Sequence, residues 1–260
     1  MKYKILYTSI KIIGILFGIV SVVRLQQIEL KSNNQYITKQ DYINQEIDKK
    51  TKLSLISQLP SFGLKNLIAD WTYLQFLQYF GNEESRSITG YSLAPKYFAE
   101  VVNRDPKFIK AYFLLSPATS IFAGEAERGV EIITEGLKSV TANTSDDAYY
   151  IWTYKAVDEL LFLGDVESAR KSYLMASKWA ESSDLPTAKD SVVNTKRTAQ
   201  FLAKNPDSLI ARIGAWTMVL NSSNDTKTQD KALEKIQELG GQIIINPDDS
   251  VKIRVPENAT

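Results

Sequence analysis

Cysteine and histidine are both absent from this chain of 260 residues. Without cysteine, the chain has no disulfides, no thiolate nucleophiles and no thiolate metal sites. Without histidine, the common zinc ligand sets and the Ser-His-Asp and Cys-His arrangements are excluded as well. Chemistry that uses carboxylates alone and the binding of hard cations remain possible.

An excess of one charge is also missing, because 31 Lys and Arg balance 30 Asp and Glu and leave a net charge of +1. This balance gives no strong field toward nucleic acid and is typical of a mixed, solvated surface. We therefore expect no nucleic-acid partner, no metal, no cofactor and no catalytic residues.

The longest apolar run, residues 5–23, reads ILYTSIKIIGILFGIVSVV and has Lys11 as its one charge. About 20 such residues cross the hydrocarbon core of a bilayer. A cleaved signal peptide is the alternative, but VSVVRLQQ offers no cleavage site of small residues. The sequence predicts a single-pass transmembrane helix in 1–23. Lys2 and Lys4 favour a cytoplasmic amino terminus and a periplasmic or lumenal repeat domain.

The segment 24–58 is mostly polar, and residues 24–52 contain neither Pro nor Gly. Its alternating charges are typical of a juxtamembrane spacer with some helix. A basic cluster that binds lipid is the alternative, and the interspersed acidic residues argue against it.

One short phrase occurs twice, as FAGEAERGVE at 122–131 and as FLGDVESARK at 162–171, 40 residues apart. Recurrence at such an interval indicates stacked repeats, whose concave surfaces usually bind protein segments. The Gly-acid pairs predict turns between paired helices. Gly129 and Ala169, the small residues of the two phrases, mark where the paired helices pack closely.

Helical periodicity covers most of the remaining chain. The segment 62–80 is apolar almost all round, so we expect it to lie between neighbouring helices. Pro117 should kink or split its helix, and Asp146 or Asp147 can cap the helix that follows. The β-branched runs QIIIN and VKIRV predict a hairpin that packs on the last helix. The expected helices are 62–80, 92–102, 108–122, 125–140, 148–163, 166–180, 186–204, 207–220 and 227–239.

The predicted fold class is all-α: a transmembrane helix followed by a solenoid of antiparallel helix pairs, with a small carboxyl-terminal β-hairpin. The corresponding domains are the anchor at 1–23, the spacer at 24–58, the repeat domain at 59–240, and the hairpin with its tail at 241–260.

The order helix, Gly-acid turn, helix and then Asp-Pro or Asn-Pro resembles the tetratricopeptide family. The phrases NRDP at 103–106 and KNP at 204–206 are similar to the turn that closes its repeats. Gly129, Ala169 and Ala232 match the family's small residue in the second helix. The resemblance covers about residues 60–240, and the interval of 40 exceeds the family's 34. It implies a divergent, protein-binding helical stack.

A second resemblance is carried by LPSFGLKNLIADWTYLQFLQYFG at 59–81. It is similar to a passage in poorly characterised, membrane-anchored bacterial repeat proteins, including cyanobacterial ones. This resemblance implies an anchor followed by a helical repeat domain, and it implies no reaction.

Asn66, Asp70 and Tyr73 form a polar-tipped stripe at i, i+4 and i+7. Such a stripe could hydrogen-bond a peptide or dock a partner helix. The alternative is that Asn66 and Asp70 bond neighbouring backbone within the fold.

Tyr112, Trp152 and Lys155 are further candidates for partner binding. They fall early in the first helices of two repeats, the surface that tetratricopeptide-like stacks turn toward ligands. Tyr and Trp are frequent interface anchors, but they are equally ordinary core residues.

The function that this pattern favours is a membrane-anchored protein-binding scaffold, or an assembly factor that recruits partner proteins at a membrane. A structural subunit of a stable membrane complex is one alternative. The other is a cell-wall-acting helical enzyme, suggested by the Glu-Ser pairs at 84–85 and 181–182. Such an enzyme would need a Glu with a raised pKa in a closed cleft. The acid pairs at 125 and 127 and at 248–249 lack the spacing of a calcium loop.

Overall fold

The computed structural model describes residues 20, 23–24, 37–245 and 251–255. It divides the chain into two units, Met1–Tyr42 and Ile43–Thr260. All of the predicted anchor except Val20 and Val23 lies outside the described residues. Within the described part of the chain, no helix is both long enough and apolar enough to cross a membrane.

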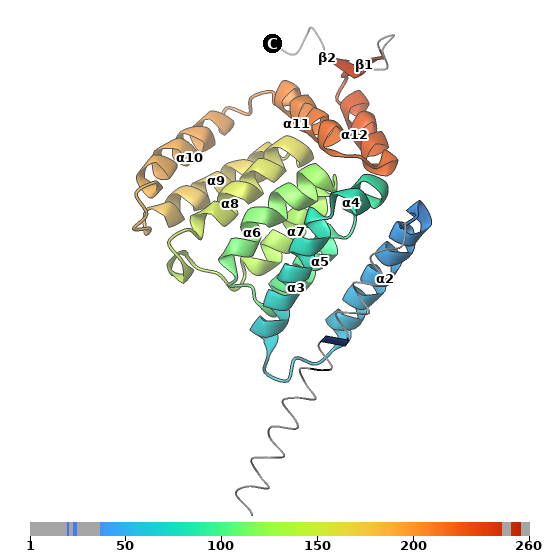
Figure 1. Cartoon of the computed structure of the whole chain (residues 1–260). Coiled ribbons are helices and arrows are strands. Elements are labelled where there is room, and N and C mark those ends of the chain that lie inside the picture. Colours follow the sequence, from blue (N-terminus) through green and yellow to red (C-terminus); the bar gives the residue numbers. More distant parts are fainter. Residues whose placement is uncertain (1–19, 21–22, 25–36, 246–250, 256–260) are drawn as a thin grey trace, which may run out of the picture. The chain divides into compact units, whose positions relative to one another are not determined.

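The described chain is mainly helical, as predicted, with one small antiparallel sheet (Figure 1). A hydrogen-bonded cap formed by Thr38 and Asp41 opens the first described long helix. The α-helices are α2 (Lys39–Gln58), α3 (Lys65–Gly81), α4 (Glu83–Thr89), α5 (Ala94–Arg104), α6 (Ile109–Ser116), α7 (Ala126–Gly136), α8 (Tyr149–Asp158), α9 (Val166–Ala180), α10 (Ala188–Leu202), α11 (Leu209–Ser222) and α12 (Thr226–Glu238). Two π-helical turns, η1 (Pro117–Phe122) and η3 (Glu159–Leu163), and one 3₁₀ turn, η2 (Ala142–Thr144), complete the helical elements.

In the second unit, several α-helices contact a sequence neighbour, and three helix pairs contact across one intervening helix. α5 packs on α7 and α6 packs on α8, while α8, α9 and α10 follow one another in contact (Figure 1). Aromatic and aliphatic residues of α3 and α5 to α8 fill one buried cluster, which includes Phe76, Phe98, Tyr112 and Leu115. Contacts of this kind are expected of stacked helix pairs.

The pair α11–α12 builds a second buried cluster. α11 contacts both η1 and η3, so it lies across the ends of two earlier helices. Phe162 of η3 meets Trp216 of α11 edge to face, with the ring centroids 5.6 Å apart. The cluster continues into the carboxyl-terminal hairpin through Ile243 and Ile253.

That hairpin confirms the prediction for the tail. β1 (Gln242–Ile245) pairs antiparallel with β2 (Val251–Arg254), with Ile243 opposite Ile253. β1 contacts α12, as expected because two strands alone are marginally stable.

The repeated phrase forms the two turns that were predicted. Gly124 and Gly164 have φ angles of 62° and 71°, in the left-handed region that favours glycine. In the first repeat the amide of Glu125 donates to the Thr119 carbonyl at 2.7 Å. In the second, the amide of Asp165 donates to the Glu159 carbonyl at 2.8 Å. The two repeats therefore close with the same hydrogen bond.

A π turn leads into each phrase and ends within its first two residues. The sequence pattern did not predict these π turns. A proline inside a helix removes one hydrogen bond and clashes with the preceding turn. At Pro117 the helix continues as η1 rather than stopping. The second repeat makes the same change at Glu159 without a proline. A π turn takes up more residues than an α turn, so it lengthens both repeats.

The small residues of the phrase lie where helices approach closely, as predicted. A Cβ at Gly129 would overlap the Thr119 hydroxyl and lie 3.3 Å from Thr119 Cβ. Ala169, the equivalent residue on α9, is fully buried. The backbone of α7 therefore approaches η1 more closely than a larger side chain would allow.

Two other expectations are wrong. Asp146 and Asp147 do not cap α8: Ala148 is its N-cap residue, without a side-chain cap. Asp147 instead pairs with Lys110 and accepts a hydrogen bond from Ser145 at 2.5 Å. The helix α3 is also not enclosed by neighbours, because one of its apolar faces is exposed.

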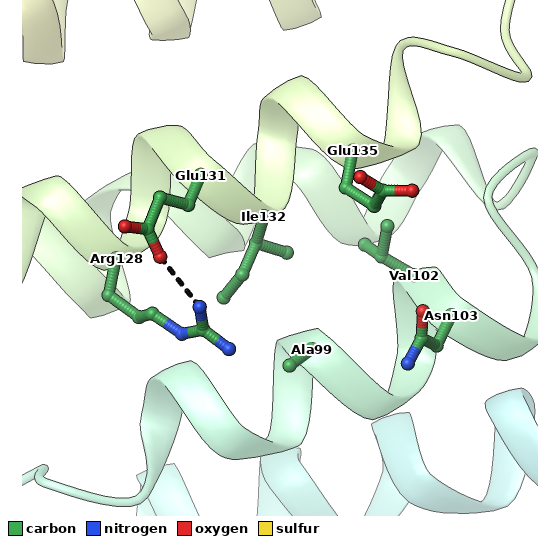
Figure 2. A pocket seen from close by; sticks show the side chains of 7 residues that line it. All are labelled: Ala99, Val102, Asn103, Arg128, Glu131, Ile132 and Glu135. Carbon is green, nitrogen blue, oxygen red and sulfur yellow. Dashed lines mark hydrogen bonds and ion pairs between the residues drawn. The ribbon is translucent and has the colours of Figure 1, made fainter.

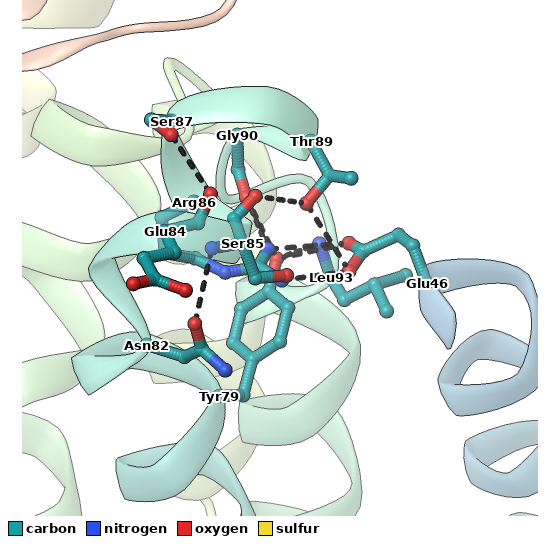
Figure 3. Close-up of polar contacts among 10 residues, drawn as sticks. All are labelled: Glu46, Tyr79, Asn82, Glu84, Ser85, Arg86, Ser87, Thr89, Gly90 and Leu93. Carbon is teal, nitrogen blue, oxygen red and sulfur yellow. Dashed lines mark hydrogen bonds and ion pairs between the residues drawn. The ribbon is translucent and has the colours of Figure 1, made fainter. Parts of the chain in front are cut away.

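A buried cationic group connects α2 to α3 and α4 (Figure 3). Arg86 is completely buried, and its Nη2 donates to Glu46 Oε2 at 2.9 Å and to Ser85 Oγ at 2.8 Å. The guanidinium also donates to the Gly90 carbonyl and lies 3.7 Å from the centre of the Tyr79 ring. Burial raises the pKa of the Tyr79 hydroxyl well above its usual value.

The glycines of two helices provide a matched test of this packing. Gly129→Ala should lower the free energy of unfolding by about 1–3 kcal/mol, because its Cβ overlaps Thr119. Gly214→Ala on α11 should raise it by up to about 1 kcal/mol, because nothing lies within 4 Å of its Cβ. Denaturant unfolding of both variants measures the difference. Equal effects would contradict the close approach at Gly129.

The buried Arg86–Glu46 pair and an exposed ion pair should differ in their effect on stability. Glu46→Ala leaves the guanidinium of Arg86 buried without its carboxylate, so we expect a loss of about 3–5 kcal/mol in unfolding free energy. Glu131→Ala removes an exposed pair with Arg128 and should cost less than about 1 kcal/mol. The double variant Glu46→Leu, Arg86→Met should recover most of the loss. Equal losses for Glu46→Ala and Glu131→Ala would contradict a structural role for this pair.

Candidate functional site

A row of exposed apolar side chains lies along α3 and the residue just before it. Leu67, Trp71 and Leu74 are 61%, 58% and 52% exposed, and Leu64 before the helix is 55% exposed. Their spacing alternates three and four residues, which is the a/d pattern of a coiled-coil seam. We call residues 64, 67, 71 and 74 the α3 seam. A seam this narrow has the width that one partner helix covers.

Trp71 also lines a hollow beside the α3 seam. The hollow has a volume of about 330 Å³. Its lining includes Leu53 and Ile56 of α2, Thr72 of α3 and Tyr97 of α5. A large aromatic side chain at the edge of a hollow is typical of an interface anchor.

Of the predicted polar stripe, two residues are exposed and the third is half-buried. Asn66 and Asp70 are exposed on α3, beside the seam. Tyr73 is half-buried, and its ring meets Phe108 edge to face at 4.9 Å. Burial raises the pKa of the Tyr73 hydroxyl. Only Asn66 and Asp70 are therefore fully available to a partner.

Tyr112 belongs to the core. It is fully buried, and its hydroxyl donates to the Pro106 carbonyl at 2.9 Å. A Cβ at Gly136 would overlap that hydroxyl, so α7 packs directly against it. Tyr112 offers no surface to a partner in this structure.

Trp152 and Lys155 lie together on α8, and both are half-buried. Trp152 meets Trp179 of α9 edge to face at 5.8 Å. Lys155 pairs with Glu159, and the carboxylate of Glu159 accepts from Ser172 at 2.6 Å. These contacts link α8 to α9 within the fold. Packing between these two helices is therefore a sufficient role for both residues.

A shallow pocket between α5 and α7 is lined by paired and exposed charges (Figure 2). It encloses about 220 Å³, and Arg128 pairs with Glu131 at its rim at 2.6 Å. Exposed pairs of this kind contribute little energy. The pocket resembles an ordinary solvated groove between two helices.

A larger and more apolar groove lies where α11 crosses η1 and η3. Its volume is about 510 Å³, and its lining includes Ile121, Val157, Leu161, Phe162 and Asp158. Its volume is within the range of small-molecule sites.

Asp158 is the most perturbed acid of the described chain. It is 1% exposed, and its Oδ1 accepts from Ser116 Oγ at 3.0 Å. Burial raises its pKa to about 7, against the lowering effect of the Ser116 and Ser120 hydroxyls. The neighbouring charge of Glu159 raises the pKa further. Strongly perturbed groups that line cavities are candidates for functional sites.

The two glutamates of the enzyme alternative lie at the surface. Glu84 and Glu181 are both exposed, so neither lies in a closed cleft. Ser85 is buried and accepts from Arg86. Residues 248–249 lie outside the described chain, and the described part holds no group of three or more acidic side chains that could bind a metal ion.

Comparison with known proteins adds no assignment: no family model matches the chain, and neither a curated protein nor a solved structure matches it.

Sequence reasoning overlooked three of the features that matter here. The α3 seam was visible as a pattern but was interpreted as core. The sequence signal for Asp158 was its place in DELLFL, where two acids directly precede an apolar run. Arg86 gave no local signal, because its partner Glu46 lies 40 residues away.

The raised pKa of Asp158 predicts a pH-dependent stability. The folded state binds this proton more tightly than the unfolded state, in which the pKa is about 3.8. Its stabilising contribution is therefore present below about pH 4 and lost as the pH rises through about 7. We expect Asp158→Asn to remove that dependence and to be more stable than the parent chain at pH 8 by about 2–4 kcal/mol.

Denaturant unfolding of both chains between pH 4.5 and 8 measures the difference, and subtraction cancels the other titrating groups. The groups that shift the pKa of Asp158 are Ser116, Ser120 and Glu159, whereas the α11 residues that line the groove are uncharged. Parallel curves for the two chains would contradict the prediction.

Proposed function

We propose that this chain is a non-enzymatic, membrane-anchored scaffold that binds an amphipathic helix of a partner protein on the α3 seam. The observation that carries the proposal is the exposure of Leu67, Trp71 and Leu74 at heptad spacing. The predicted transmembrane helix supports a location at a membrane. The resemblance to tetratricopeptide stacks supports protein binding.

A helix is the occupant that the geometry favours. The exposed residues form a stripe rather than a broad sheet of apolar surface, and a/d stripes are covered by one helix through knobs-into-holes packing. Asn66 and Asp70 flank the stripe with hydrogen-bonding groups. An apolar core with a polar rim is the usual composition of a protein interface.

The seam is separable from the stability of the fold. Its side chains are more than half exposed, so replacing them changes the unfolding free energy by no more than about 0.5 kcal/mol. Leu67→Asp with Leu74→Asp should therefore leave the domain folded and abolish helix binding. The matched control is Val193→Asp with Phe201→Asp on α10, where both residues are similarly exposed.

A photoreactive amino acid at Gln78, the next seam position, provides the measurement in native membranes. We expect adducts with one other protein, in a segment whose apolar residues recur at helical spacing. The yield should fall about tenfold or more in the α3 double variant and remain unchanged in the α10 control. Adducts formed mainly with lipid or with a second copy of this chain would overturn the proposal. So would an equal yield in the two double variants.

A further inference from the structure

The turn between α2 and α3 has a backbone conformation that does not favour its residues. The Leu64 amide donates to the Ser61 carbonyl at 2.7 Å, which closes a tight turn over residues 61–64. Both central residues, Phe62 and Gly63, have positive φ angles, of 46° and 84°. Such turns favour Gly, Asn or Asp at both central positions, and a bulky side chain with positive φ is an outlier. The stability of the turn therefore does not account for the phenylalanine at position 62.

The same turn exposes apolar side chains at one end of the helical stack (Figure 1). Phe62 is 87% exposed, more than any other large apolar side chain of the described chain, and Leu59 is 57% exposed. Arg104 of α5 holds the turn in place, because its Nη2 donates to the carbonyls of Ile56 and Leu59 at 2.7 and 3.0 Å. The backbone before the turn is therefore hydrogen-bonded to the stack, while the side chain of Phe62 gains almost no burial.

The chain around this turn is basic, although the whole chain is nearly neutral. Residues 49–69 contain four lysines and neither Asp nor Glu. The acids interspersed in the predicted spacer all precede this segment. Three of the lysines, Lys50, Lys52 and Lys65, are exposed, on either side of the turn. Exposed aromatic and aliphatic side chains among lysines are typical of surfaces that bind anionic lipids.

A bilayer surface fits this turn better than a protein does. Phe62 protrudes, so a protein partner would need a pocket of matching shape, whereas lipids accommodate a protruding apolar side chain without one. A segment as long as residues 24–38, which follow the predicted anchor, can reach about 50 Å. This reach exceeds the length of about 30 Å of a helix of 20 residues such as α2. The turn can therefore meet the bilayer that holds the predicted anchor.

We infer that the α2–α3 turn is a second membrane contact, at which Phe62 and Leu59 insert into the interface of an anionic bilayer. The three exposed lysines around the turn lie at the lipid phosphates. The inference rests on the membrane location in the proposed function and is independent of helix binding on the α3 seam. Gln78 lies near the opposite end of α3, so lipid at the turn and a partner helix at Gln78 are compatible.

The absence of native cysteine allows a single probe to be placed at the turn of the full chain. Ser61→Cys is labelled with an environment-sensitive fluorophore and reconstituted into vesicles of phosphatidylcholine and phosphatidylserine. The matched control is Ser182→Cys, in the exposed turn between α9 and α10. Nitroxide groups on the upper part of the acyl chains should quench the probe at position 61 at least about threefold more than the probe at position 182.

A substitution at Phe62 separates membrane insertion from stability. Phe62→Asn should remove most of the additional quenching at position 61, because it removes the inserted ring. It should not lower the free energy of unfolding, because asparagine tolerates a positive φ angle better than phenylalanine does. Quenching that is unchanged in a folded Phe62→Asn variant would contradict the inference.

Neutralising the basic residues tests the role of lipid charge. The triple variant Lys50→Gln, Lys52→Gln, Lys65→Gln should lose the dependence of quenching on phosphatidylserine. The matched control replaces three exposed lysines on and just after α10 with glutamine: Lys189, Lys196 and Lys204. It should behave as the parent chain does, and equal losses in the two triple variants would argue against a contact at the turn.

Two further outcomes would overturn the inference. One is equal quenching at positions 61 and 182. The other is a probe at position 61 that is shielded from water but insensitive to the lipid quencher, because a protein would then cover the turn. Flotation with vesicles of phosphatidylcholine alone reports insertion of the predicted anchor. A chain that does not float contradicts the membrane location and this inference with it, whereas a floating chain with no quenching at position 61 contradicts only the contact at the turn.

Discussion

The buried guanidinium of Arg86 is the constraint on which the arrangement of the amino-terminal helices depends. A buried cation is costly unless it is paired and hydrogen-bonded. The partner, Glu46, is supplied by α2, which precedes the helical stack in the chain. The segment that the sequence predicted to be a spacer therefore supplies the carboxylate that neutralises the buried Arg86.

The π turn η3 begins directly after α8, so Asp158 and Glu159 lie at the junction of α8 and η3. The two acids have different environments there. Glu159 is compensated by Lys155 and Ser172, so its charge stabilises the contact between α8 and α9. Asp158 accepts from the Ser116 hydroxyl and lies beside the Ser120 hydroxyl, and burial raises its pKa. One of the two adjacent carboxyl groups is thus paired with a lysine, whereas the other lies among hydroxyls without a cation.

Local signals were sufficient for most of the fold. The boundaries of α9 were predicted to the residue because a capping acid, Asp165, and regular spacing coincide there. The hairpin was predicted from its β-branched runs. Non-local contacts gave no such signal: the Arg86–Glu46 pair and the crossing of α11 over η1 and η3 depend on tertiary packing. Of the predicted site residues, Asn66 and Asp70 remain fully exposed, because periodicity identifies a face but not what covers it.

Trp71 and Gly214 share a property that ordinary packing does not require. Trp71 leaves 58% of its surface exposed in the described fold, and Gly214, an exposed glycine within a helix, lowers the stability of that helix. Natural sequences generally agree with their fold at each level, and departures concentrate at functional sites. The two departures are chemically different, one a protruding apolar side chain and the other a missing one. A protruding apolar side chain gains further burial only when a partner covers it, and this is the basis of the proposal for the α3 seam.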